Sequence, residues 1–291
     1  MAAFETPEPI SVLIELVMAD VRISASDRAD TVVEVRASDP ARRADVDAAE
    51  QVRVEYSAGG LLVKATGRRR SWSPFSYGGS VEVEILLPTG SRVKGSSVGA
   101  VRCTGALGDC QIKTSVGDIQ VETAGGVSLT TSAGDISLDR ADGDAELTTG
   151  SGDIRAGDID GSVEIKNSNG DTHLGEVTGA ARVKAANGDV AIDRIAGSVT
   201  VKTANGDIRI GAVGTGSVVA QSGYGSIEIG IPDGIAAWLD LVTTYGQLRN
   251  SLETSGPPGP GEQTVEVHAR SGYGDLTIRR CYPQAPIDST A

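Results

Sequence analysis

A Gly-Asp pair returns through the middle of this chain at an interval close to eighteen residues. Most copies of the pair are followed by an apolar residue, and a second glycine stands nine residues ahead of most of them. A fixed period of this length indicates stacked copies of one small unit, because a single unit of this size cannot bury an apolar face alone. The repeat therefore predicts a solenoid. The six regular pairs are Gly117-Asp118, Gly134-Asp135, Gly152-Asp153, Gly170-Asp171, Gly188-Asp189 and Gly206-Asp207.

One repeat shows how the unit folds. In residues 161–177, Val163 and Ile165 alternate with polar neighbours, as they do in a half-buried strand. A turn at Asn169-Gly170-Asp171 follows, and then a second short strand with Thr172 and Leu174 directed inward. No apolar stripe with a helical period is present in the sequence. We therefore predict an all-β fold, a β-solenoid with rungs of about eighteen residues stacked along one axis.

The pattern divides the chain into three parts. Residues 8–90 predict longer, less regular strands that are continuous with the solenoid, with a polar, Ala-rich loop at 39–50 that has room for one helical turn. Residues 91–280 carry the solenoid repeats, and two longer final rungs are expected at 235–252 and 264–280. A Gly- and Pro-rich loop separates these two rungs. Residues 281–291 show no pattern and predict a disordered tail.

Stacking would place each repeat position about 4.8 Å from its copy in the next rung. The aspartates would then form a file of carboxylates, in which neighbours repel by only about 1 kcal/mol in water. We expect each Asp to cap its own turn, because Asp after Gly accepts backbone N–H groups in tight turns. The alternative is a divalent cation. Each turn carries one Asp rather than a doubled Gly-rich nonapeptide, so we expect no calcium, no other metal and no cofactor.

Three further files of side chains follow from the same period. Stacked amides can hydrogen-bond along the axis and stacked rings can pack on one another, while a row of lysines can offset the aspartates. We interpret all three files as structural; the alternative is a carbohydrate- or peptide-binding face beside the tyrosines. The files are Asn169, Asn187 and Asn205, then Tyr224, Tyr245 and Tyr273, and Lys166, Lys184 and Lys202.

One segment lies apart from the repeats, between glycines at 67 and 78. It holds three arginines and three aromatic residues, and Arg, Trp and Tyr are the residue types that anchor interfaces. The segment is therefore a candidate protein-interaction loop. The alternative is an irregular hairpin loop whose aromatic side chains fold back over the end of the solenoid. The candidate residues are Arg68, Arg69, Arg70, Trp72, Phe75 and Tyr77.

Charge and composition limit the partners. The net charge of −13 disfavours attraction to phosphate backbones, so we expect no nucleic-acid partner. Cys103, Cys110 and Cys281 lack a metal-binding spacing, and the first two are predicted to be small buried hydrophobic residues. No apolar segment has the length of a membrane span, and the N-terminus lacks the pattern of a secretory signal. These features favour a cytoplasmic protein.

Several runs resemble one known family. They are the Gly-Ser-Val-x-Val-Lys-Thr-x-Asn-Gly-Asp-Ile run at 197–208, a weaker copy at 161–171, the segments 86–90 and 231–234, and the closing run at 271–276. Through them the chain, from about residue 8 to 280, resembles the bacterial putative-adhesin family. These are β-strand-repeat domains of unknown function related to the toast-rack domains of envelope-stress proteins. The resemblance implies no catalytic motif, and it makes an envelope-associated location the alternative to a cytoplasmic one.

Motifs for catalysis are missing from the sequence. It contains no Gly-x-Ser-x-Gly elbow, no His-Glu-x-x-His pair and no phosphate-binding loop. We therefore predict a protein that is not an enzyme: an interaction or scaffold protein of the putative-adhesin type, whose rigid solenoid presents a repeated surface to an unknown protein partner. The alternative is a carbohydrate-binding or carbohydrate-cleaving solenoid, because the many Asp and Glu residues could supply a carboxylate pair.

Overall fold

The computed structural model of the chain describes residues 1–66, 79–252 and 263–281. Almost all of the regular structure in these residues is β-strand, with one short helix, α1 (Arg43–Glu50). The strands are β1 (Ala2–Glu5), β2 (Ser11–Ser26), β3 (Asp30–Ala37), β4 (Val52–Ser57), β5 (Gly60–Ala65), β6 (Val81–Pro88), β7 (Arg92–Val98), β8 (Val101–Ala106), β9 (Cys110–Thr114), β10 (Ile119–Ala124), β11 (Val127–Ala133), β12 (Ile136–Ala141), β13 (Ala145–Ser151), β14 (Ile154–Ile159), β15 (Val163–Asn169), β16 (Thr172–Val177), β17 (Ala181–Asn187), β18 (Val190–Ile195), β19 (Val199–Asn205), β20 (Ile208–Val213), β21 (Gly216–Tyr224), β22 (Ile227–Pro232), β23 (Ala236–Tyr245), β24 (Leu248–Asn250), β25 (Thr264–Tyr273) and β26 (Leu276–Cys281).

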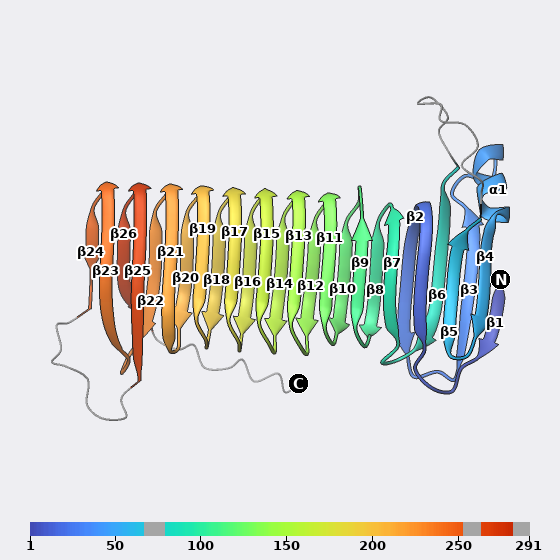
Figure 1. Cartoon of the computed structure of the whole chain (residues 1–291), viewed down its shortest axis with the longest axis horizontal. Helices are drawn as coiled ribbons and strands as arrows, with labels where there is room; N and C mark the ends of the chain where they lie inside the picture. Colours follow the sequence, from blue (N-terminus) through green and yellow to red (C-terminus); the bar gives the residue numbers. More distant parts are fainter. Residues whose placement is uncertain (67–78, 253–262, 282–291) are drawn as a thin grey trace, which may run out of the picture. The chain divides into compact units, whose positions relative to one another are not determined.

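The chain forms two compact units, residues 1–157 and 158–291. In each unit, short strands from successive repeats stack side by side in two parallel ladders, sheet A and sheet B, with one turn between them in every rung (Figure 1). The prediction of an all-β solenoid is therefore confirmed.

Strand β2 gives the N-terminal unit its particular strand order. It is 16 residues long, enough to supply a whole rung by itself. Its first half lies between β5 and β7 in sheet B, and its second half lies between β6 and β8 in sheet A. Three antiparallel pairings, β1 with β3, β3 with β6 and β4 with β5, complete this part. The rungs β7–β8, β9–β10 and β11–β12 then follow in chain order.

The C-terminal unit ends with an exchange of rung order. Sheet B runs β15, β17, β19, β21, β25 and then β23, and sheet A runs β16, β18, β20, β22, β26 and then β24. The two longer final rungs were expected from the sequence. Their order in space is the reverse of their order in the chain, because the rung β25–β26 lies between β21–β22 and β23–β24.

Alternation within the strands separates the core from the surface. In sheet B of the C-terminal unit, Ile165, Val183 and Val201 occupy one register position in successive rungs, and none of them has exposed surface. In sheet A, Ile208 and Ile210 are buried while Arg209 between them is exposed. Parallel stacking therefore buries the same apolar positions rung after rung.

Close packing at the turns requires glycine. Gly188 has a φ of +135°, and a Cβ placed there would lie 2.0 Å from the carbonyl oxygen of Gly170 in the preceding rung. The same approach recurs at Gly134 in the N-terminal unit, where the distance to the carbonyl oxygen of Gly117 would be 2.2 Å. Only glycine accommodates both the backbone conformation and the contact. This explains why the glycine of the Gly-Asp pair recurs when the residues around it vary.

A column of buried hydroxyl groups lies just inside these turns. Thr149 donates to the carbonyl oxygen of Gly134, and Ser222 donates to that of Gly206 (3.0 and 2.9 Å). Each donor stands three residues before the glycine of its own turn and reaches the turn glycine of the preceding rung. A buried carbonyl left without a donor costs about 1–3 kcal/mol of stability. The hydroxyl at this position therefore helps to stabilise the interior. The sequence pattern indicated Thr172 as an inward polar residue, but it did not indicate the hydroxyl position three residues before the turn glycine.

Residues 39–50 differ from their prediction. Arg43–Glu50 within them form an eight-residue helix, α1, where a loop with one helical turn was predicted. The cause is Asp45, which is buried and whose carboxylate accepts the backbone N–H groups of Asp39 and Ser80 (3.2 and 3.1 Å). A buried carboxylate with two donors fixes the helix to the chain on either side of it. Among the described residues, no helix is long and apolar enough to cross a membrane.

A pair of neighbouring substitutions tests the assignment of inward and outward positions. Ile208→Asp would bury an unpaired charge between two rungs and should cost about 4 kcal/mol or more of unfolding free energy. Arg209→Asp places the same side chain on the outer face and should change stability by less than about 1 kcal/mol. Chemical denaturation of both variants measures the difference. Equal losses in the two variants would show that the assignment is wrong.

Candidate interaction surface

The interaction loop predicted from the sequence lies outside the described residues. Its six candidate residues, Arg68, Arg69, Arg70, Trp72, Phe75 and Tyr77, fall within 67–78. The structure therefore does not test the loop, and it remains a prediction. The files of repeated side chains and several exposed aromatic residues lie within the described part of the chain.

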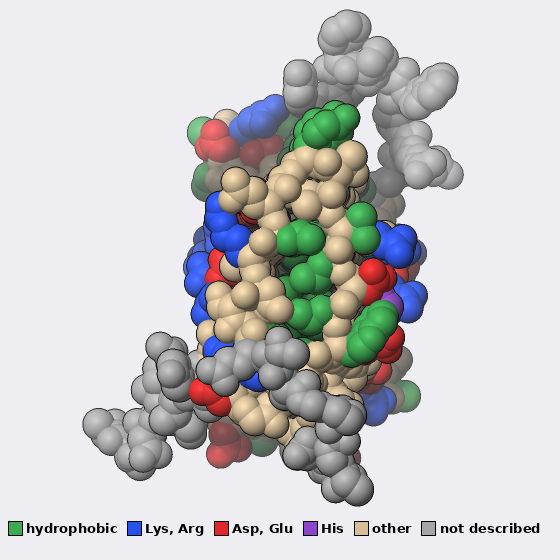
Figure 2. Space-filling model, turned by 90° about the vertical axis from the view of Figure 1, so that its left-hand side faces the viewer, with side chains coloured by type: hydrophobic (Ala, Val, Ile, Leu, Met, Phe, Trp, Pro, Cys, Tyr) green, Lys and Arg blue, Asp and Glu red, His purple; other side chains and the backbone are tan. Residues whose placement is uncertain are grey.

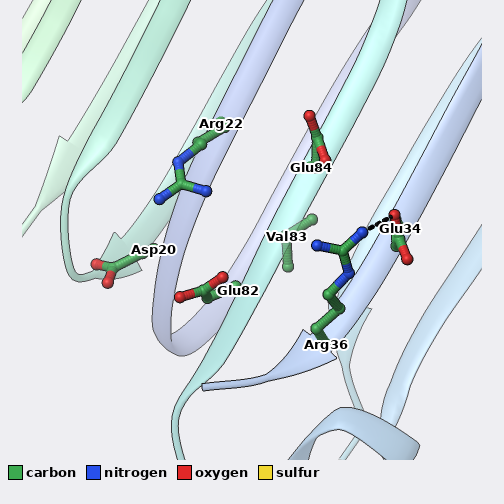
Figure 3. Close-up of a pocket in the computed structure, with 7 residues that line it drawn as sticks. All are labelled: Asp20, Arg22, Glu34, Arg36, Glu82, Val83 and Glu84. Carbon is green, nitrogen blue, oxygen red and sulfur yellow. Dashed lines mark hydrogen bonds and ion pairs between the residues drawn. The ribbon is translucent and has the colours of Figure 1, made fainter. Parts of the chain in front are cut away.

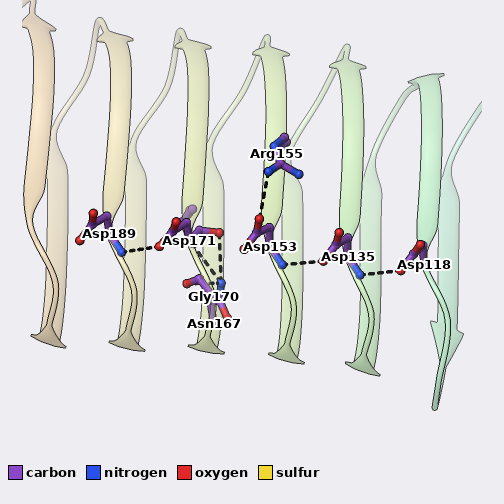
Figure 4. A network of polar contacts seen from close by, with 9 residues as sticks. Asp118, Asp135, Asp153, Arg155, Asn167, Gly170, Asp171 and Asp189 are labelled. Atoms are coloured by element: carbon purple, nitrogen blue, oxygen red, sulfur yellow. Dashed lines mark hydrogen bonds and ion pairs between the residues drawn. The ribbon is translucent and has the colours of Figure 1, made fainter.

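The aspartates of the Gly-Asp pairs bond along the axis rather than within their own turns. The backbone N–H of Asp135 donates to Oδ1 of Asp118, and that of Asp189 donates to Oδ1 of Asp171 (2.9 and 2.8 Å; Figure 4). The last link of the C-terminal unit runs from the N–H of Gln247 to Oδ1 of Asp275 (2.9 Å). The expectation that each Asp caps its own turn was therefore wrong. These carboxylates join two rungs, which also explains how a file of like charges is tolerated.

The described residues contain no group of three or more His, Cys, Asp and Glu side chains arranged to hold a metal ion. The aspartates already serve as acceptors for backbone groups, as described above. Lys166, in the lysine file, is 3.2 Å from Glu164 on the same strand. Lys166 thus meets a carboxylate on its own strand, which agrees with a structural role for this position.

The asparagine and tyrosine files form one continuous ladder in the C-terminal unit. Nδ2 of Asn187 donates to Oδ1 of Asn169, and Nδ2 of Asn205 donates to Oδ1 of Asn187 (3.0 and 2.8 Å). Asn205 is in register with Tyr224, which is in register with Tyr273. The amide ladder therefore gives way to an aromatic stack at the last rungs, as the period predicted.

The three tyrosine rings are stacked in the order 224, 273, 245. The ring centroids of Tyr224 and Tyr273 are 4.8 Å apart with an interplanar angle of 5°, and those of Tyr273 and Tyr245 are 4.6 Å apart with an angle of 14°. All three side chains are about half exposed or more, at 60%, 48% and 62% for Tyr224, Tyr273 and Tyr245. The stack covers the inner ring faces and leaves ring edges, together with the outer face of Tyr245, toward solvent.

A second aromatic group lies on the outer face of the same strands. Trp238, on β23, is 58% exposed, and its ring meets that of His268 on β25 edge to face, with centroids 5.3 Å apart. The strand pattern explains its position: Leu239 and Leu241 point inward, so Trp238 points outward. We call Tyr224, Tyr245, Tyr273 and Trp238 the aromatic surface. Sequence reasoning identified the tyrosines but missed Trp238, although the alternation in residues 236–245 was enough to place it.

Charged side chains beside Trp238 are paired with one another. Nδ1 of His268 is 3.2 Å from Oδ2 of Asp240, and Nε2 is 3.1 Å from Oε1 of Glu266. Arg270 lies 3.6 Å from the same Asp240 carboxylate. The hydrogen bond to Asp240 raises the pKa of His268; partial burial opposes the rise and Glu266 adds to it. This cluster fixes the outer face of β23 and β25 beneath the indole ring.

A shallow depression in the N-terminal unit gathers charges of both signs. Figure 3 shows its side chains on β2, β3 and β6. Nη2 of Arg36 donates to Oε2 of Glu34 (2.6 Å), and this bond lowers the pKa of Glu34. A glycosidase acid needs the opposite shift, so this carboxyl is unsuited to that role. The lining residues are Asp20, Arg22, Glu34, Arg36, Glu82, Val83 and Glu84.

The three cysteines are buried and form no disulfide with one another. Cys103 and Cys110 are buried in the N-terminal unit, as predicted, and Cys281 is buried in the C-terminal unit; all three are free. A hydrogen bond with Cys110, together with burial, raises the pKa of Cys103 well above its usual range. Burial also raises the pKa of Cys281. Because the thiolate is the reactive form, the raised pKa values disfavour reaction at Cys103 and Cys281.

Comparison with known proteins identifies a family and several solved structures that are similar to this chain. The Toastrack DUF4097 family model matches residues 11–279 of the chain. Among solved structures, a putative adhesin from Bacteroides fragilis is 14% identical, with 96% of this chain and 95% of that chain covered and a TM-score of 0.43. A putative adhesin from Parabacteroides distasonis is 15% identical, with 95% of each chain covered and a TM-score of 0.40. None of the curated proteins matches the chain.

The histidine cluster yields a prediction for titration. The imidazole of His268 should titrate above the ordinary value of about 6.5, because Asp240 and Glu266 favour its charged form. Since the folded pKa is raised, the cluster stabilises the protein at low pH, and this contribution is lost as the pH rises through the folded pKa. NMR titration should show the midpoint falling in Asp240→Asn.

A matched control is Asp193→Asn, which removes a carboxylate 3.2 Å from His173 and should leave the His268 midpoint unchanged. A His268 midpoint at or below the ordinary value in the unmodified protein would contradict the described geometry.

Proposed function

The chain belongs to the Toastrack DUF4097 family, and from this premise we propose that it is a non-catalytic scaffold of the adhesin type that binds a protein partner through the aromatic surface. One observation carries the proposal. Four large aromatic side chains, each about half exposed or more, lie on the last rungs of the C-terminal unit. The three stacked tyrosines stand at the turn that ends β21, β23 and β25, and Trp238 stands on the outer face near the start of β23. Backbone ladders hold these strands in place.

Tyrosine and tryptophan suit such a surface for physical reasons. They bury a large apolar area on binding, lose few side-chain rotations, and keep one polar group for a hydrogen bond. The stacked rings of Tyr224, Tyr273 and Tyr245 are already ordered by each other, so little conformational entropy is lost when a partner covers them. A pre-ordered aromatic surface on a repeated backbone is therefore suited to binding rather than to chemistry.

The stacking also weighs against a carbohydrate ligand. A sugar ring packs on an open aromatic face, and the faces between Tyr224, Tyr273 and Tyr245 are occupied by neighbouring rings at 4.6–4.8 Å. Of these four described side chains, the two end rings of the stack and the exposed part of Trp238 remain for a sugar. We therefore prefer a protein partner, whose side chains can contact ring edges and hydroxyl groups.

Quantitative affinity capture with defined variants tests the proposal. The immobilised chain is compared with the double variant Trp238→Ala/Tyr245→Ala and with Val116→Ala, which removes an apolar side chain 57% exposed in the N-terminal unit. Proteins enriched by the unmodified chain should also be enriched by Val116→Ala and should be lost with the double variant. Because the substituted side chains are exposed, the thermal midpoints of the three proteins should agree.

Two further arms separate the alternatives. Deletion of residues 68–77 tests the predicted loop: if capture is lost with this deletion and kept by the double variant, the binding site is the loop rather than the aromatic surface. A glycan array tests the other ligand class. Glycan binding that disappears in Trp238→Ala would support the carbohydrate-binding alternative and contradict the preference for a protein partner.

A further inference from the structure

The last rung of the C-terminal unit is open on one side. Within the described residues, β23 pairs only with β25, and β24 pairs only with β26. Every preceding rung of that unit from β17–β18 to β25–β26 has a neighbour on both sides. The β23–β24 rung therefore ends a ladder with an unused edge.

The direction of the backbone groups on this edge follows from one hydrogen bond. The N–H of Ala236 donates to the carbonyl oxygen of Gln263, next to β25 (3.1 Å). In a parallel strand successive residues point their N–H and C=O groups to opposite sides. The amides of Ala237, Leu239, Leu241 and Thr243 are thus directed away from β25, toward the open side. A regular row of donors and acceptors is available there for another strand.

The inward side chains of the rung are also only partly covered. On β25, the inward residues Val267 and Ala269 have no exposed surface, whereas their register partners on β23, Leu239 and Leu241, are partly exposed. Leu248 on β24 is 54% exposed. Figure 2 views the molecule from this side and shows hydrophobic side chains at the centre of the face, ringed by backbone and polar atoms. The solenoid core thus continues to the surface here.

Protection against strand pairing is weak at this edge. Native proteins shield edge strands by making them short or by placing charges on them. Strand β4, which pairs only with β5 in the part of the chain that the structure describes, has both devices: it has six residues and carries Arg53 and Glu55. Strand β23 has ten residues, and its one charged residue, Asp240, is held on the outer face by His268 and Arg270. Such an edge is expected to be covered by a partner.

Charge points to the kind of partner. The chain carries a net charge of −13, which opposes contact between two copies over most of the surface. Residues 235–252 contain one acidic and one basic residue, Asp240 and Arg249, so this rung has no net charge. Two copies that meet at this end bring no excess like charge together. The apolar centre of the face on one copy would pack against the same apolar centre on the other.

We propose that two copies of this chain associate end to end through β23 and β24, with the two β23 strands paired antiparallel about a twofold axis. An axis passing beside Leu241 would pair that residue with its symmetry mate and Leu239 with Thr243 of the second copy, so inward positions meet inward positions. Asp240 would face Val242 of the second copy rather than another Asp240. The association goes beyond the proposed partner binding, because it uses the edge and the inward side of β23. It meets the aromatic surface only at Tyr245, which would stand opposite Ala237 of the second copy, and it leaves Trp238 on the outer face.

Analytical ultracentrifugation of the full chain over a wide concentration range tests the proposal. The unmodified protein should sediment with twice the 29.8 kDa mass of one chain at high concentration. Leu241→Lys would bury one ammonium group per copy in the contact and should raise the dissociation constant at least about a hundredfold. Val242→Lys makes the same charge change one residue later, on the outer face, and should leave the dimer intact.

Hydrogen exchange supplies an independent readout that needs no substitution. The amides of Ala237, Leu239, Leu241 and Thr243 should exchange more slowly as the protein concentration rises, whereas those of Trp238 and Asp240, directed to β25, should be protected throughout. A monomer at every concentration would overturn the proposal. So would a dimer that persists in a folded Leu241→Lys variant, or exchange at residues 236–245 that is independent of concentration.

Discussion

The close approach of successive turns is the constraint on which the rest of the structure depends. At Gly134 and at Gly188, an added Cβ would lie 2.2 and 2.0 Å from the carbonyl oxygen of the preceding turn glycine. Glycine at these points lets the chain reverse within one strand spacing, so that each rung lies directly against the next. The following aspartate then accepts a backbone N–H of the next rung, and the buried hydroxyl three residues earlier satisfies a turn carbonyl. The strands between the turns need only alternate apolar and polar residues to complete the core.

This division of roles explains what could be predicted from the sequence. The period and the alternation identify the solenoid, the inward positions such as Ile208, and the stacking of the asparagines and tyrosines, because each depends only on residues within one repeat. The predicted donor to the aspartate carboxylates was wrong, because the true donor lies in the next rung rather than in the same repeat. Asp171 is able to cap its own turn or to accept from Asp189, and the choice depends on how the backbone groups of two successive turns are oriented, which one repeat does not reveal.

The order in which unlike rungs lie beside one another could not be predicted from the sequence either. Nothing in residues 235–281 indicates that the later rung, β25–β26, lies inside the earlier one, since both alternate equally well. The same holds for β2, which lies between β5 and β7 although both follow it in the chain. Helix α1 formed where a loop was expected, because the buried Asp45 finds its donor at Ser80, thirty-five residues away. Long-range pairings of this kind leave no local period.

The candidate site follows from the same architecture. A ladder position occupied by asparagine within the solenoid is occupied by Tyr224, Tyr273 and Tyr245 at the last rungs, where the side chains have no structural need to be aromatic. Trp238 stands on the outer face of the same end. The fold thus separates two tasks: the turns and the interior hold the rungs together, and the last rungs of the C-terminal unit carry the side chains suited to contact with other molecules.

Native-state amide hydrogen exchange at the turn aspartates tests the central claim most directly. The account places the N–H groups of Asp135, Asp153, Asp189 and Asp207 in hydrogen bonds to the carboxylate of the preceding rung, at 2.8–2.9 Å. These amides should exchange slowly although their turns are at the surface, and they should become exposed only together with the strands on either side. If they exchange at the rate of unprotected amides while the strands stay protected, the aspartates do not join the rungs, and the account is contradicted.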